Sequence, residues 1–124
     1  MEAVTDDIFI IDNLQQDDAQ IIANLRINKN STIFKGHFPG QPIVPGACML
    51  QLVKDALEKT QRASLLLKKA NNLKFISMVN PKINANALLY ITYKTAGDGD
   101  ISVNAKLITD GVTCFKFQGD FIIV

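Results

Sequence analysis

The sequence has few of the residues that would point to several large classes of protein. It holds one His and two Cys in 124 residues, with no CxxC pair, so a metal site is not expected. Its 13 basic and 12 acidic residues nearly cancel, which argues against a nucleic-acid-binding protein. No apolar run reaches the length that would span a bilayer. What remains is a chain of one-domain length whose 48% hydrophobic content is enough for a core.

The N-terminus and the two cysteines indicate a cellular compartment. Glu2, Asp6 and Asp7 stand where a signal peptide would carry a basic segment followed by an apolar one, so no signal peptide is expected. Cys48 and Cys114 fall in different predicted elements and are interpreted as buried free thiols. Free thiols are typical of a reducing environment, so we expect a cytoplasmic protein.

Several segments alternate apolar and polar residues, as half-buried strands do. Residues 4–11 contain a short apolar run that fits either a strand or a docked turn, and a lysine-rich connection precedes residue 73. Turn signals at residues 97–100 and at Asp110-Gly111 join the last strands as hairpins, so a largely antiparallel sheet is expected. The predicted strands are residues 19–28, 73–79, 87–95, 101–108 and 112–124.

One helix is predicted, beginning near Gly46 or Ala47 and running to Arg62. Its first turns are apolar nearly all round, whereas Gln51 and Asp55 belong to a later polar stripe, so the N-terminal turns should be the more deeply buried. One helix with about five strands indicates an α+β fold in which the sheet curls round the helix.

The loop before this helix holds the only His, His37, and three of the four Pro. An imidazole can take and return a proton near neutral pH, and Pro residues would restrict its loop. The helix start offers backbone N–H groups and a positive dipole end, and Gly46 lets a ligand approach closely. Together these features suit proton removal next to a carbonyl. The alternative, that His37 is only a hydrogen-bonded loop residue, stays open on the residues alone.

The run from His37 to Gly46 reads His-Phe-Pro-Gly-Gln-Pro-Ile-Val-Pro-Gly, with Phe34 and Gly36 before it. It resembles the signature of the hot-dog-fold 3-hydroxyacyl-acyl carrier protein dehydratases of fatty acid synthesis, and the resemblance extends over most of the chain. It is similar in kind to the dehydratase-like proteins of aryl-polyene pigment pathways, although the motif does not decide between these branches.

The resemblance implies one hot-dog domain over residues 1–124, with a curled antiparallel sheet wrapped around one long central helix. It implies that water is eliminated from a 3-hydroxyacyl thioester of acyl carrier protein or coenzyme A, giving a trans-2-enoyl thioester. No cofactor or metal is implied. The pathway would make fatty acids or polyketide-like lipids and pigments.

The resemblance also implies roles for individual residues. His37 would remove the α-proton, and the Gly46 N–H would polarise the thioester carbonyl. The helix position of the family's catalytic acid is occupied by Gln51, which cannot titrate near pH 7. Asp55 lies one helical turn further on. The implied substrate-binding residues are Phe38, Pro39, Gly40, Ile43, Val44, Pro45, Ala47 and Leu50.

Three interpretations of Gln51 remain open. Asp55 could supply the carboxyl while Gln51 orients the substrate or a water. The chain could be a non-catalytic homologue that binds acyl chains or acyl carriers. It could instead be a thioesterase in which Gln51 positions water. Alternatively, Gln51 and Asp55 merely begin the solvated stripe of the helix.

The family resemblance further implies a dimer with the central helices side by side, in which His and helix acid of one site come from different subunits. Higher oligomers or a heterodimer are also compatible. A basic patch could receive an acidic carrier protein, although a solvated lysine-rich face is the more ordinary explanation. The candidates for that patch are Arg62, Lys68, Lys69 and Lys74.

Overall fold

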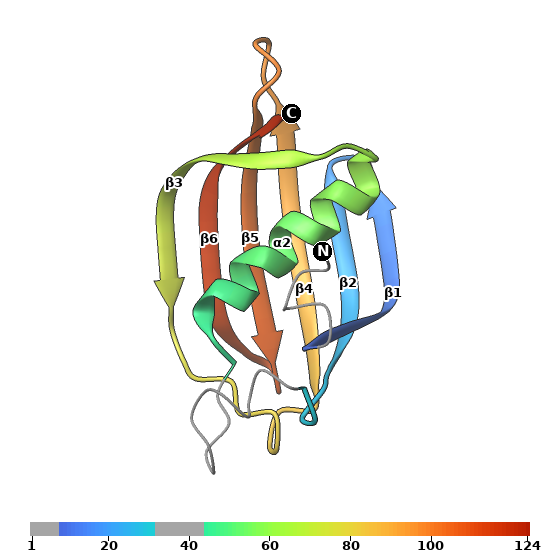
Figure 1. Ribbon diagram of the computed structural model, residues 1–124, viewed down its shortest axis with the longest axis vertical. Coiled ribbons are helices and arrows are strands. Elements are labelled where there is room, and N and C mark those ends of the chain that lie inside the picture. The colour runs from blue at the N-terminus through green and yellow to red at the C-terminus, as the bar shows by residue number, and fades with distance from the viewer. Residues whose placement is uncertain (1–7, 32–43) are drawn as a thin grey trace.

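The computed structural model describes residues 8–31 and 44–124, which form one antiparallel sheet and a helix lying across it (Figure 1). The sheet order is β1-β2-β4-β5-β6-β3. The helix α2 crosses one face diagonally, from the β3–β6 side towards β1 (Figure 1). The predicted α+β fold, with a sheet curled round one helix, is confirmed. The elements are β1 Phe9–Asp17, β2 Gln20–Ile27, α2 Gly46–Gln61, β3 Leu65–Phe75, β4 Asn86–Thr95, β5 Ile101–Thr109 and β6 Val112–Ile123.

Alternation sets the two faces of the central strands. In β5, Ile101, Val103, Ala105 and Leu107 are buried beneath α2, whereas the alternate residues Ser102, Asn104 and Lys106 are exposed. The hairpin between β5 and β6 turns at Asp110 and Gly111, whose φ angles are 51° and 77°. Two successive positive φ angles are the geometry of a tight hairpin turn, so the predicted turn is confirmed.

Two strands at the sheet edges differ from the prediction. Of the run predicted at residues 4–11, residues 4–7 lie outside the described residues, and Phe9 begins a strand, β1, that continues to Asp17. The strand predicted at residues 73–79 instead spans Leu65–Phe75, and it includes the stretch interpreted as a lysine-rich connection. Both are edge strands, and most of their residues are exposed, so the expected apolar–polar alternation is weak in them. The described chain therefore has six strands.

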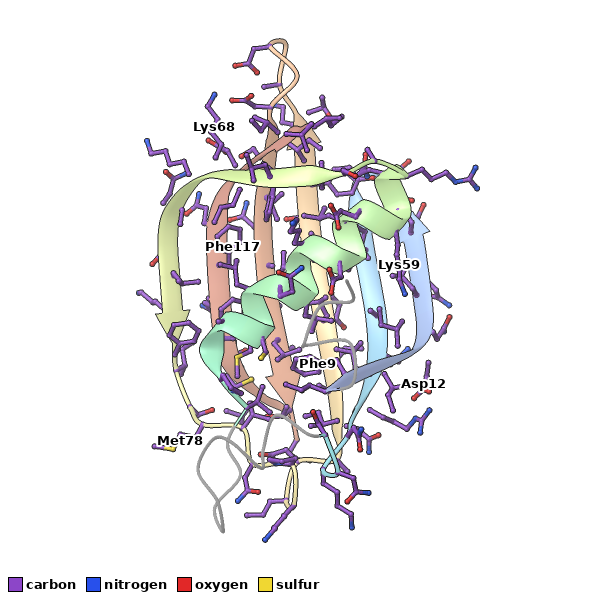
Figure 2. The ribbon with its side chains drawn as sticks, viewed as in Figure 1. Phe9, Asp12, Lys59, Lys68, Met78 and Phe117 are labelled. Atoms are coloured by element: carbon purple, nitrogen blue, oxygen red, sulfur yellow. The ribbon has the colours of Figure 1, made fainter. Side chains whose placement is uncertain are left out.

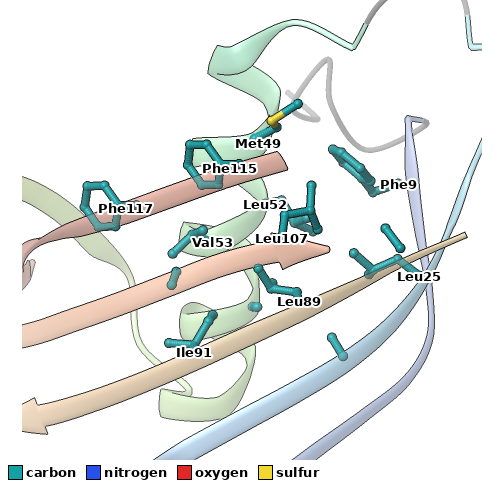
Figure 3. Close-up of a cluster of buried hydrophobic side chains, with 14 of the residues drawn as sticks. Phe9, Leu25, Met49, Leu52, Val53, Leu89, Ile91, Leu107, Phe115 and Phe117 are labelled. Carbon is teal, nitrogen blue, oxygen red and sulfur yellow. The ribbon is translucent and has the colours of Figure 1, made fainter. Parts of the chain in front are cut away.

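The core lies between α2 and the concave face of the sheet (Figure 3). Each large apolar side chain buried there contributes roughly 1.5–3 kcal/mol. Figure 3 shows Leu52 and Val53 of the helix directed towards Leu89 and Leu107 of the sheet. The helix side of this contact is made by Cys48, Met49, Leu52, Val53, Ala56 and Leu57.

The prediction that the N-terminal turns of α2 are the more deeply buried is wrong. Ala56 and Leu57 near the C-terminal end are fully buried, whereas Ala47 is exposed and Leu50 is half-buried. One face of the helix is buried along its whole length, because a single sheet can cover one side only. The apolar residues on the other side of the first turns stay uncovered in one chain. Within residues 8–31 and 44–124, no helix has the length and apolar character needed to cross a membrane.

Both cysteines are buried free thiols, as predicted. The Cys114 Sγ donates a hydrogen bond to the Leu107 carbonyl at 3.3 Å. Burial raises the pKa of the Cys114 thiol, because desolvation disfavours its charged form.

Candidate functional site

The start of α2 is held in place by backbone hydrogen bonds. The buried Val44 donates its N–H to the Val79 carbonyl at 2.9 Å, and extended Pro45 forms the N-cap. The Cys48 N–H turns back to the Pro45 carbonyl at 3.0 Å. The helix therefore begins at Gly46, as predicted, and the amides of its first residues form the positive end of the helix dipole.

Gly46 lies against an aromatic ring that the sequence did not single out. A Cβ at residue 46 would come within 2.5 Å of the Phe75 Cζ, so only glycine fits beneath the ring in this position. Phe75 comes from the end of β3, and its ring centroid is 5.5 Å from that of Phe115. The side chain is 54% exposed. No local pattern could have identified Phe75, because its contact with Gly46 depends on where β3 ends relative to α2.

Gln51 and Asp55 are brought together on α2. The Gln51 Nε2 donates to the Asp55 Oδ1 at 2.9 Å, and both residues are half-buried. The two side chains are therefore less exposed than the interpretation as part of a solvated helix stripe implies. This contact is what residues one helical turn apart can make.

Asp55 lines a cleft of about 610 Å³ between α2 and β1. The β1 wall is apolar, and the helix wall carries two carboxyl groups and one lysine. Figure 2 labels Phe9 and Lys59 on its two walls. The Glu58 Oε2 accepts a hydrogen bond of 2.8 Å from the Leu65 N–H, which ties this side chain to the start of β3. The lining residues are Phe9, Ile10, Ile11, Leu52, Asp55, Glu58 and Lys59.

Gly46 and Asp55 face opposite sides of the helix. They are separated by about two and a half turns, which places them on opposing faces and roughly 13 Å apart along the axis. Gly46 accordingly lies against Phe75 of β3, whereas Asp55 faces the cleft beside β1. One chain therefore does not bring the helix start and the Asp55 carboxyl around one small substrate.

The other predicted site residues divide into described and undescribed groups. Val44 is buried, Pro45 and Leu50 are half-buried, and Ala47 is exposed, all at or near the helix start. Within the described ranges, no three His, Cys, Asp or Glu side chains gather as a metal site would require. The predicted site residues outside the described ranges are His37, Phe38, Pro39, Gly40 and Ile43.

The predicted basic patch is interrupted by acidic side chains. Lys68 forms a salt bridge of 2.5 Å with Asp100, and the hydrogen bond to that carboxylate raises the pKa of Lys68. Lys69 lies opposite Asp120 in the β3–β6 pairing. Arg62 lies at the opposite end of β3 from Lys74, as the helix C-cap in the left-handed region with φ 52°.

Known proteins that resemble this chain in sequence are dehydratases. The family model for ApeI-like dehydratases matches residues 13–111. The 3-hydroxyacyl-acyl carrier protein dehydratase FabZ of Syntrophomonas wolfei is 30% identical over 120 residues, covering 86% of this chain and 80% of that relative. FabZ of Lactobacillus helveticus is 29% identical over 104 residues, covering 76% of this chain and 68% of that protein.

A solved structure, the dehydratase heterocomplex ApeI:P from Xenorhabdus doucetiae, superposes with a TM-score of 0.74 at 18% sequence identity. The match covers 92% of this chain and 97% of that one. This similarity confirms the predicted hot-dog fold.

Proposed function

Because the chain belongs to the ApeI-like dehydratase family, we propose that it eliminates water from a 3-hydroxyacyl thioester to give a trans-2-enoyl thioester. The observation that carries the proposal is the family match over residues 13–111, which spans the His37 loop and all of α2. Two relatives named as 3-hydroxyacyl-acyl carrier protein dehydratases support a thioester on acyl carrier protein as the substrate class. A coenzyme A thioester has the same reacting atoms.

The reaction requires a base, an oxyanion donor and an acid. In the proposed mechanism His37 removes the α-proton, and the electron pair of that C–H bond moves towards the thioester carbonyl. The Gly46 N–H, at the positive end of α2, stabilises the oxygen that gains charge. The pair then forms the Cα–Cβ double bond as the Cβ–O bond breaks. The hydroxyl leaves as water once an acid has protonated it.

We assign the acid to Asp55, positioned by Gln51. A carboxyl can supply the proton, and an amide cannot. The 2.9 Å hydrogen bond from Gln51 Nε2 fixes one oxygen of Asp55 in the cleft beside β1. In this arrangement Gln51 acts through Asp55 as a positioning residue.

The proposed site is assembled from two chains. Gly46 and Asp55 of one chain face opposite sides of α2, so a shared substrate requires one of them from each chain. Within the described chain, β3 pairs with β6 on one side only, which leaves its other edge available to a second strand. We propose a homodimer in which the β3 edges pair and the two α2 helices lie side by side, so that the helix of one chain carries Asp55 towards the helix start of the other. A heterodimer is the alternative favoured by the ApeI:P heterocomplex of the structural relative.

The test is turnover of 3-hydroxyacyl carriers by purified protein, followed in both directions by enoyl absorbance. We expect His37→Ala to lower the rate about 10²–10⁴-fold, as loss of a general base does. Lys29→Ala, in the exposed turn after β2, is the matched control and should leave the rate unchanged. No turnover in either direction by wild type would contradict the proposal. Thiol release from unsubstituted acyl thioesters would identify a thioesterase, and acyl-thioester binding without turnover a binding homologue.

A further inference from the structure

The face of the sheet opposite α2 carries a row of three lysines. Lys106 of β5 lies directly opposite Lys116 of β6, and Lys116 lies directly opposite Lys74 of β3. Lys106 is exposed between Ala105 and Leu107, which are buried towards the helix, so it points to the outer face. Since α2 covers the other face (Figure 1), this row is separate from the proposed dehydratase site.

The row is electrostatically unfavourable in the protein alone. Like charges directly opposite each other on adjacent strands destabilise a sheet. Two salt bridges occur among the described residues, Arg26–Asp12 and Lys68–Asp100, and neither involves these three lysines. The whole chain has a net charge of only +1, so this row is a local concentration of charge and not part of a general excess. Three uncompensated ammonium groups in one line favour a multiply charged anion.

A hollow of about 330 Å³ lies over the same strands, and Lys106 and Lys116 line it. On the same face, beside the lysine row, strands β3, β4, β5 and β6 carry uncharged side chains that can donate and accept hydrogen bonds. Asn104 lies opposite both Thr92 and Gln118, and Asn72 lies opposite Gln118. The Lys106 Nζ lies 5.4 Å from the centroid of the Tyr90 ring, which fixes that amine at the edge of the hollow. The remaining lining residues are Asn72, Tyr90, Thr92, Asn104, Ala105, Phe117 and Gln118.

We propose that this hollow binds a small molecule carrying two or more linked phosphate groups. Lys106 and Lys116 would make charge-assisted hydrogen bonds to the phosphate oxygens, and Lys74 would add to the positive field from the neighbouring strand. The carboxamides of Asn104 and Gln118 and the Thr92 hydroxyl would receive the uncharged part of the ligand. A volume of about 330 Å³ is at the lower end of the range for small-molecule sites.

Other occupants fit less well. A second copy of this face would bring lysines against lysines, which disfavours self-association. A single-stranded nucleic acid uses successive aromatic platforms for its bases. In the described lining of the hollow, Phe117 is buried on the other side of the sheet and the Tyr90 ring already contacts Lys106.

The experiment measures binding of inorganic tripolyphosphate and ATP by calorimetry and by the shift of Tm, at constant ionic strength. Orthophosphate, a single-stranded oligonucleotide and an acidic peptide serve as comparison ligands. The test variant is Lys106→Gln with Lys116→Gln. The control is Lys29→Gln with Lys94→Gln, which removes the same two charges at exposed positions that do not line the hollow.

We expect tripolyphosphate and ATP to bind wild type and raise its Tm, and affinity to fall about tenfold for each lysine removed. The double variant should also melt higher than wild type without ligand, because the cross-strand repulsion is relieved. The control Lys29→Gln with Lys94→Gln should bind as wild type does. Failure of both oligophosphates to bind at millimolar concentration, or equal binding by the double variant, would overturn the proposal. Tighter binding of the oligonucleotide or peptide through the same lysines would overturn it in favour of a macromolecular partner.

Discussion

At the level of single residues, the side-chain amide of Gln51 holds the carboxyl of Asp55 through a hydrogen bond of 2.9 Å. Gln51 occupies the helix position that the resemblance assigns to the catalytic acid. Through this contact it is bonded to Asp55, whose carboxyl group can carry a proton. An amide at residue 51 is therefore compatible with dehydration if Asp55 carries the proton. The carboxyl would lie one helical turn further along α2 than the resemblance implies.

Exchanging the carboxyl and the amide tests this assignment. Asp55→Asn should lower kcat about 10²–10⁴-fold, because it removes the proposed general acid. Adding Gln51→Glu to that variant should recover activity at least about tenfold, since a carboxyl returns to the same helix face. Steady-state dehydration rates measure both effects.

Asp17→Asn, the same chemical change at the exposed end of β1, is the control and should have the wild-type rate. Wild-type activity in Asp55→Asn would show that another group protonates the leaving hydroxyl.

The contact between Gly46 and Phe75 yields a stability prediction. Gly46→Ala should cost about 0.5–1.5 kcal/mol of unfolding free energy, because the new methyl group overlaps the half-exposed Phe75 ring and forces it away from its present rotamer. Removing the ring with Phe75→Ala should abolish most of that additional cost. Urea unfolding of the two single variants and the double variant measures the coupling.

Gly97→Ala is the matched glycine control, since a Cβ at residue 97 meets no atom within 4 Å. Equal costs for Gly46→Ala with and without the Phe75 ring would show that the two residues are not in contact.

At the level of elements, β3 carries Phe75 against the helix start, and most of its residues are exposed to solvent. It forms one edge of the sheet, and only Leu65 of its residues is fully buried. Exposed apolar side chains gather on β3 and the segment after it, and Figure 2 labels Met78 at the periphery of the molecule. An edge strand with apolar side chains and one unpaired side is suited to pairing with a second strand. The exposed residues are Leu66, Leu73, Phe75, Ile76 and Met78.

Charging this edge should separate the proposed dimer. We expect wild type to sediment as a dimer at micromolar concentration and Leu66→Lys with Ile76→Lys to sediment as a monomer, because four lysines would then meet at the interface. Val112→Lys with Ile83→Lys adds two lysines at exposed apolar positions away from β3 and should leave the dimer intact. Analytical ultracentrifugation measures the mass, and circular dichroism checks that each variant is folded.

A monomeric wild type at tens of micromolar would contradict the dimer. In that case the two-chain site would fail with it, whereas turnover by the monomer would still identify a dehydratase.

At the level of the whole molecule, one core joins α2 to all the central strands, and both thiols are buried in it. Cys48 is on the helix and Cys114 on β6, so exposing both requires the helix to leave the sheet. Only the thiolate reacts readily, and burial raises the pKa of Cys114. The native state therefore keeps that proton at pH values where the unfolded chain loses it, and this contribution to stability falls as pH rises past the ordinary thiol range.

Thiol labelling should accordingly report global unfolding. We expect neither cysteine to react with a thiol reagent in the native protein, and both to react at the unfolding transition in denaturant. Ser102→Cys, which places a thiol on the exposed face of β5, should label at once and serves as the positive control. Labelling of Cys48 or Cys114 at the rate of that exposed thiol would show that the core opens locally.

Prediction from the sequence succeeded where the signal was local. The alternation in β2 and β5 identified both strands and their buried faces, and Asp110-Gly111 identified the last hairpin. The Pro45-Gly46 pair indicated a helix start near Gly46 or Ala47, and the helix begins at Gly46. Prediction was less accurate for the edge strands β1 and β3. Most of their residues are exposed, so their sequences lack the apolar–polar alternation of half-buried strands.

Short-range patterns were enough to predict one helix among strands, a helix start near Gly46 or Ala47, and the placement of Gln51 and Asp55 one turn apart, because each depends on residues a few positions apart. Three relations became visible only in the folded chain: Phe75 covers Gly46, Gly46 and Asp55 face different edges of the sheet, and three lysines form one row, namely Lys106, Lys116 and Lys74. These relations depend on strand register and on which strand lies at the edge. Register joins residues far apart in the chain, and hydrogen bonds and burial across the whole sheet select it.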